Sequence, residues 1–200
     1  MTHGLKKLFE VLFPHTKLNH SLRILIITNS MMVFILGLFA PFYAVFIRNI
    51  GGSIAFAGFS WGVLLIVAGT LIFLFSNWEL KVKEPELLIA FAHIIRGVVF
   101  LSYAFMGSMT QLIVTQVLWG IAIALSAPAF DSVYSAHTDK DGAISEWGGW
   151  EGIAAISSGT AALVGGLIIE SFGYQPVFIS MAAISVGLGI YIWRLPREVL

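Results

Sequence analysis

Long apolar segments fill most of the chain, and short polar stretches separate them. Each holds roughly 20 mostly apolar residues, the length that a helix needs to cross a bilayer. There are six: 24–47, 54–75, 87–106, 111–130, 150–169 and 177–193. Backbone groups in lipid must bond within their own segment, so isolated apolar segments of this length can only be helices. The pattern predicts an all-α membrane protein with six transmembrane helices.

Composition supports a lipid environment. Hydrophobic residues make up 58% of the chain and charged residues 11%, with a mean hydropathy of +0.91. A soluble domain is typically about 45–50% apolar and about 25% charged. The absence of cysteine excludes disulfides and cysteine-bound metals. The zero net charge gives no indication of nucleic-acid binding.

Positive charges predict the orientation. If the N-terminus is cytoplasmic, the cytoplasmic segments hold nine basic residues: Lys6, Lys7, Lys17, Arg23, Lys81, Lys83, Lys140, Arg194 and Arg197. The external segments hold only Arg48, and Arg96 lies within the third span. Because cytoplasmic loops carry an excess of Lys and Arg, we expect a multi-pass protein of the cell membrane with both termini in the cytoplasm.

Residues 1–20 form a separate N-terminal segment. Leu5, Leu8, Phe9 and Leu12 share one helical face, which predicts a short helix lying in the membrane interface. A frayed tail is the alternative.

The chain contains an internal similarity. "TNSMMVFILGLFAPFY" (28–43) aligns with "TQVLWGIAIALSAPAF" (115–130), and "AGFSWGVLLIVAG" (57–69) aligns with "AAISSGTAALVGG" (154–166). We interpret 21–107 and 108–200 as two three-helix repeats. Three is odd, so the second repeat would enter the membrane from the opposite side. Inverted repeats are typical of secondary transporters, although apolar segments also align by chance.

Six helices in two inverted triplets resemble half of a major facilitator superfamily transporter. "SGTAALVGGLIIESFGYQPVF" (158–178) is similar to the family's passage from the fifth to the sixth helix, and 115–130 is similar to its fourth helix. The resemblance implies transport of a small organic solute by alternating access. The loop "FSNWELKVKEPE" (75–86) keeps only two lysines of the family's motif, and Gln116 stands where a proton-coupling arginine often lies. Both departures argue against the family's standard proton coupling. The lack of a clear buried acid in the first span favours facilitated diffusion.

The family normally has twelve helices in two similar halves. The resemblance therefore implies a homodimer in which two copies enclose one pathway. Two alternatives stay open: one half of a longer proton-coupled drug transporter, and a transport-inactive membrane scaffold or assembly protein with the same fold.

Several polar and aromatic residues within the spans are candidates for binding the substrate. Amides and hydroxyls beside indole rings suit a neutral polar solute such as a sugar. The candidates are Asn29, Ser60, Trp61, Gln116, Trp119, Trp150, Glu151 and Ser157. Hydrogen bonding between helices explains the amides equally well, and anchoring at the membrane surface explains several indoles.

Other residues are candidates for bending the helices, for gating or coupling, and for forming a dimer. Pro41 and Pro128 predict bent helices, while Arg96 and Asp131 are candidates for gating or coupling, and an ion pair between Arg96 and Glu151 is the structural alternative. Gly58, Gly62, Gly159 and Gly166 are small residues that let helices approach closely. Helices two and five of the two halves meet in the resembled fold, so the resemblance implies a dimer interface at these glycines. The sequence shows no catalytic motif, so we expect neither an enzyme nor a bound metal or cofactor.

Overall fold

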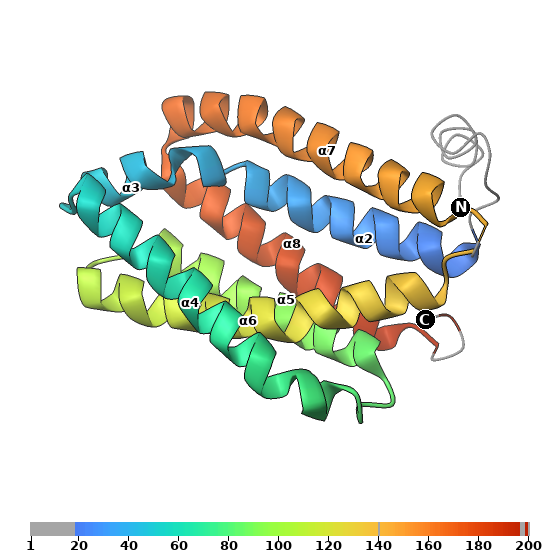
Figure 1. Ribbon diagram of the computed structural model, residues 1–200. Coiled ribbons are helices and arrows are strands. Elements are labelled where there is room, and N and C mark those ends of the chain that lie inside the picture. The colour runs from blue at the N-terminus through green and yellow to red at the C-terminus, as the bar shows by residue number, and fades with distance from the viewer. Residues whose placement is uncertain (1–18, 140, 197–198, 200) are drawn as a thin grey trace.

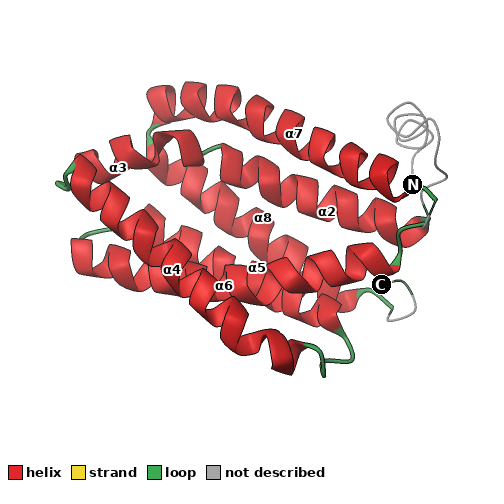
Figure 2. Ribbon diagram, viewed as in Figure 1, coloured by secondary structure: helices red, strands yellow, loops and turns green. Residues whose placement is uncertain are grey.

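The computed structural model describes residues 19–139, 141–196 and 199. The interfacial helix expected near the N-terminus lies outside these residues. Figure 2 shows that the regular structure in the described part of the chain is helical throughout.

The described residues form a bundle of six helical spans. The first is divided into α2 (His20–Gly37), η1 (Ala40–Phe42) and α3 (Tyr43–Asn49). The others are α4 (Ile54–Glu79), α5 (Pro85–Ala104), α6 (Met109–Ala136), α7 (Ala143–Phe172) and α8 (Tyr174–Arg194). All six are long and apolar enough to cross a membrane, which confirms the predicted all-α membrane fold.

Local sequence determines where these helices begin and end. Ser53 and Ser108 accept hydrogen bonds from the backbone at the first turns of α4 and α6. Gly173, with a φ of 80°, separates α7 from α8. The stretch 131–149, between the fourth and fifth predicted spans, is mostly helical, because α6 extends to Ala136 and α7 begins at Ala143.

The most extensive helix contacts are α5 on α8, α4 on α6, α5 on α6, and α2 on α7 (Figure 1). Glycines lie at these crossings. A Cβ atom on Gly37 would come within 2.8 Å of a backbone oxygen of α7, and one on Gly120 within 2.9 Å of a backbone oxygen of α4. Close backbone approach at small residues is how membrane helices associate.

One pair of contacts corresponds under the internal similarity. Exchanging the first span for the fourth, and the second for the fifth, converts the α2–α7 pair into the α6–α4 pair. The contact of α5 with α6 has no such counterpart, because α8 contacts α2 much less. The first described helix begins at the end of the bundle where α8 finishes (Figure 1), and we call this the termini end. The division into repeats at residues 107 and 108 stays a prediction.

Two helices have little protein around them. In their most apolar windows, 17% of the residues of α4 and 11% of those of α7 are buried, against 44% or more in the other spans. Large apolar side chains cover their open faces, among them Phe59, Ile66, Phe73, Ile156, Leu163 and Leu167. These faces are available to lipid or to another protein.

Candidate functional site

A cavity of about 280 Å³ lies between α2, α5, α6 and α7. Its position follows from its walls, because its lining residues come from the middle of the first span (His20–Asn49), the first half of α7 and the second half of α6. It therefore lies toward the termini end, and we call it the termini-end cavity. Its polar lining consists of Asn29, His93, Arg96, Ser126, Asp131 and Glu151, and its aromatic lining of Phe130, Trp147 and Trp150.

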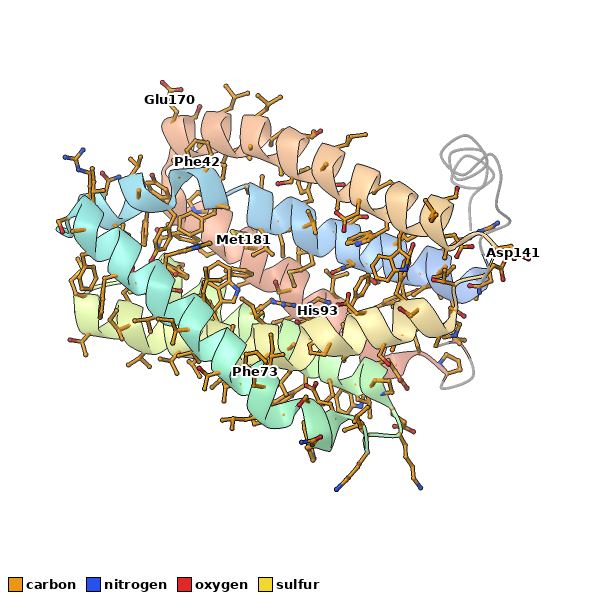
Figure 3. The ribbon with its side chains drawn as sticks, viewed as in Figure 1. Phe42, Phe73, His93, Asp141, Glu170 and Met181 are labelled. Atoms are coloured by element: carbon orange, nitrogen blue, oxygen red, sulfur yellow. The ribbon has the colours of Figure 1, made fainter. Side chains whose placement is uncertain are left out.

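Arg96 forms the polar wall of this cavity. The side chain is only 8% exposed, and it donates to Ser126 Oγ at 2.6 Å. Its Nη1 lies 3.2 Å from His93 Nδ1, which must accept because a guanidinium has no lone pair to offer. Figure 3 shows His93 in the interior of the bundle, between the helices. Arg96 Nε has no hydrogen-bond partner.

The two carboxylates of the cavity lie on other helices. Asp131 of α6 and Glu151 of α7 are exposed, and they lie close enough to interact electrostatically. The ion pair considered between Arg96 and Glu151 is not found: within the described ranges, the hydrogen-bond partners of Arg96 are His93 and Ser126. The cavity thus has a buried positive wall and separate negative groups.

Aromatic rings complete the termini-end cavity. The rings of Phe130 and Trp150 lie 5.3 Å apart, and those of Tyr134 and Trp147 lie 4.5 Å apart. The Tyr134 hydroxyl donates to the backbone oxygen of Glu146 at 2.8 Å, which ties α6 to the first turn of α7. These contacts hold the indoles of α7 in place beside the cavity.

A second polar group lies toward the other end of the bundle. Gln116, which is fully buried in α6, donates through Nε2 to the hydroxyl of Tyr43 in α3. That hydroxyl lies 2.6 Å from the buried Ser60 Oγ of α4. Trp61 packs on Tyr43 and on Trp119, at ring distances of 5.2 and 6.0 Å. We call Tyr43, Ser60 and Gln116 the tyrosine cluster.

The sequence candidates therefore separate into two places. Asn29, Trp150 and Glu151 line the termini-end cavity together with Arg96 and Asp131. Gln116, Trp119, Ser60 and Trp61 lie in or beside the tyrosine cluster. Ser157 is half-buried on α7 and belongs to neither group. Asn29 and Gln116 are aligned in the internal similarity, yet they face different surroundings.

The two matched prolines also differ. Pro41 lies in η1, where the first span breaks between α2 and α3. Pro128 lies inside a continuous α6. Proline removes one backbone hydrogen bond in either place. The first span is thus the more divided of the two.

The candidate interface glycines lie on α4 and α7. A Cβ atom on Gly58, Gly62 or Gly159 would meet nothing within 4 Å, so these positions are open. Gly166 is different, because its Cβ would lie 3.1 Å from the Phe42 ring of the same chain. Gly166 therefore already serves packing between α7 and η1.

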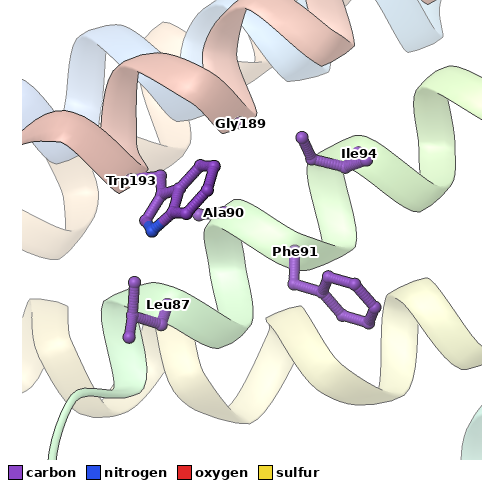
Figure 4. Close-up of a pocket in the computed structure, with 6 residues that line it drawn as sticks. All are labelled: Leu87, Ala90, Phe91, Ile94, Gly189 and Trp193. Atoms are coloured by element: carbon purple, nitrogen blue, oxygen red, sulfur yellow. The ribbon is translucent and has the colours of Figure 1, made fainter.

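An apolar pocket of about 420 Å³ lies between α5 and α8 (Figure 4). Its walls are Leu87, Ala90, Phe91, Ile94, Gly189 and Trp193. No charged or amide side chain lines it, so it has nothing to orient a polar solute. Its chemistry suits an acyl chain.

Two residues of these polar sites, Tyr43 and Trp147, were not predicted from the sequence. Tyr43 follows Pro41 by two residues in an apolar run, and nothing local shows that its hydroxyl meets Gln116. Trp147 was not among the candidates from the sequence, yet it lines the termini-end cavity. Within the described residues, no group of three or more His, Cys, Asp or Glu side chains is placed to hold a metal ion.

Comparison with known proteins gives similarities over most of the chain. The chain is 27% identical over 147 residues to the uncharacterized MFS-type transporter YitZ of Bacillus subtilis, covering 74% of this chain and 89% of YitZ. It is 27% identical over 179 residues to the multidrug resistance protein MdtG of Citrobacter koseri, covering 87% of this chain and 44% of MdtG. MdtG of Salmonella paratyphi B is 25% identical over the same span.

The chain therefore spans less than half the length of the MdtG proteins that it matches. No family model matches the chain, and no solved structure does. The similar proteins are transporters and not enzymes, as expected from the sequence. Their similarity agrees with the six apolar helices and their packing. The chain is a multi-pass membrane protein with six membrane-capable helices, and it is similar to transporters of the major facilitator type.

Proposed function

We propose that the chain transports a small polar solute by alternating access and forms one of two six-helix halves around a central pathway. The termini-end cavity carries this proposal. A largely apolar bundle places six polar side chains and three aromatic rings around one space. Polar groups within a membrane are expensive, and they commonly mark a pathway for a solute or ion.

The second half is proposed to be another copy of the chain. Asp131 and Glu151 are exposed beside the cavity, so one side of the cavity has no protein wall. The poorly covered α4 and α7, with open glycines at Gly58, Gly62 and Gly159, provide a face against which a second unit can pack. Closed twofold dimers are the commonest oligomers.

The proposed orientation places both termini in the cytoplasm of a cell-membrane protein. The termini-end cavity then opens toward the cytoplasm. The tyrosine cluster lies toward the external side, where its buried hydrogen bonds hold α3 against α4 and α6. This arrangement corresponds to an inward-facing state.

Drug export is a second candidate function. The names of the MdtG relatives include multidrug resistance, and each match covers 44% of the MdtG chain. A neutral sugar remains the expectation drawn from the amides and indoles. A scaffold without transport is the remaining alternative, and it predicts no solute binding.

A solute screen tests the transport proposal. The purified protein in detergent is heated with sugars, amino acids and lipophilic cations, and unfolding is monitored. A bound ligand raises the melting temperature because it stabilises the folded state, by about 2.7 kcal/mol at a hundred times its Kd. Solutes that bind are then tested for uptake into vesicles containing the protein. Absence of both binding and uptake would contradict transport.

Disulfide cross-linking tests the second half. The chain lacks cysteine, so single cysteines report without background. Gly159→Cys on the open face of α7 is expected to form dimers in membranes under oxidation. Leu101→Cys on the 48% exposed outer face of α5 is the matched control and should stay monomeric. Equal cross-linking of the two variants would contradict the proposed interface.

A further inference from the structure

The charges around the termini-end cavity allow the solute to be specified further. Arg96 lines the cavity, and only 8% of this residue is exposed. Its Nε has no hydrogen-bond partner. Its two hydrogen-bonded neighbours are the imidazole of His93, which accepts through Nδ1, and the hydroxyl of Ser126. Neither group carries a negative charge. A buried cation without a counterion is costly in low dielectric. An anionic group of a ligand would supply the missing partner.

A simple anion does not fit the rest of the cavity. Asp131 and Glu151 line the same space and repel a second negative charge. Both are exposed, whereas Arg96 is buried. A simple cation fits no better, because its charge is opposed by Arg96. The cavity therefore offers a positive site in its wall and a negative site at its open side.

We infer that the solute is a small zwitterion, with a carboxylate bound at Arg96 and a protonated amine bound between Asp131 and Glu151. This inference rests on the proposed transport function and names the substrate class of that site. Arg96 matches a carboxylate because the guanidinium presents several N–H donors in one plane. Ser126 fixes the guanidinium, since its hydroxyl accepts from Arg96 and donates to Ala122 O at 2.9 Å.

The size and the apolar lining narrow the class. The cavity measures about 280 Å³, just below the range of about 300–1,000 Å³ that is typical of drug-sized ligands. Trp147, Trp150 and Phe130 offer ring faces and edges beside the charged groups. An amino acid with an apolar or aromatic side chain satisfies the charges, the volume and the rings together.

Three compounds with a shared skeleton test the charge requirement. Phenylalanine carries both charges, phenethylamine lacks the carboxylate, and 3-phenylpropionate lacks the amine. Binding to the purified protein in detergent is measured by thermal shift and by calorimetry. We expect phenylalanine to bind at least ten times more tightly than either fragment, and more tightly than glucose.

Two variants assign the charges. Arg96→Gln should abolish the preference for phenylalanine over phenethylamine, and Arg194→Gln, at an exposed position outside the cavity, should preserve it. The double variant Asp131→Asn, Glu151→Gln should abolish the preference over 3-phenylpropionate. Both carboxylates are exposed, so this variant is expected to fold even if Arg96→Gln does not.

The binding and uptake results distinguish a failure of the zwitterionic substrate from a failure of the transport function. Binding of glucose or of lipophilic cations without binding of phenylalanine or any other zwitterionic amino acid would overturn the zwitterion and leave transport standing. Equal affinity for phenylalanine and its two fragments would also overturn it. No binding and no uptake of any solute in the screen would overturn the transport function itself.

Discussion

At the residue scale, the clearest structural role belongs to Tyr43. Its hydroxyl accepts from Gln116 and lies beside Ser60, so one side chain joins three spans. All three partners are buried, and each would leave an unsatisfied polar group in the bundle if its partner were removed. Polar contacts of this kind stabilise membrane helices by about 0.6 kcal/mol on average, and by up to about 1.7 kcal/mol.

Tyr43→Phe is therefore expected to lower the free energy of unfolding by about 1–2 kcal/mol, because Gln116 and Ser60 lose a shared partner. Thermal unfolding in detergent measures the change. Tyr191→Phe is the matched control, since Tyr191 is 47% exposed on α8. A loss no larger than that of the control would show that the tyrosine cluster does not stabilise the fold.

Asn29 tests whether the termini-end cavity holds water. Asn29→Cys is expected to react rapidly with a water-soluble maleimide in native membranes, because the cavity is polar and open. Val98→Cys should react slowly despite the 55% exposure of that site, because hydrocarbon surrounds it and suppresses the thiolate. Equal rates would mean that lipid fills the cavity.

At the element scale, glycines determine how closely the helices approach. Gly189 and Gly187 lie two residues apart on α8 and face different surroundings. A Cβ atom on Gly189 would come within 2.8 Å of the backbone oxygen of Ala90 in α5, while one on Gly187 would meet nothing within 4 Å. The same substitution should therefore have opposite effects at the two positions.

Gly189→Ala is expected to destabilise the protein by about 1–3 kcal/mol, the usual cost of overpacking. Gly187→Ala should leave stability unchanged or raise it by up to about 1 kcal/mol, because alanine favours helix over glycine. Melting temperatures of the two variants give the comparison. Similar values would contradict the close contact between α5 and α8.

At the scale of the whole molecule, the orientation in the membrane determines whether the termini-end cavity opens to the cytoplasm or to the outside. The α3–α4 connection and the α4–α5 connection lie at opposite ends of the bundle (Figure 1). The positive charges Lys81 and Lys83 are in the second connection, which is therefore expected to be cytoplasmic.

A membrane-impermeant maleimide applied to intact cells should label Asn49→Cys and not Lys83→Cys. Permeabilised cells should show labelling of both, because both side chains are exposed. The reverse pattern would place the termini-end cavity on the outside and invert the proposed direction of access.

The sequence predicted the fold better than it predicted the site. Thr28 and Thr115, matched in the repeat, each donate to the carbonyl four residues earlier in their own helix. Asn29 and Gln116 were matched in the same way, but Asn29 lines a cavity and Gln116 is fully buried. The local hydrogen bond depends only on the helix, whereas the surroundings of an amide depend on which helices pack against it.

The sequence by itself determined the number of spans and their helical form. These follow from segment length and hydropathy, which act within a few turns of one chain segment. Proline alone did not determine where a span breaks, because the first span divides at Pro41 whereas α6 continues through Pro128. Only the tertiary structure decided that Tyr43 meets Gln116 and that Arg96 meets Ser126, across 73 and 30 positions of sequence. Such contacts depend on the rotation of each helix about its axis, and that rotation is set by close packing against neighbouring helices.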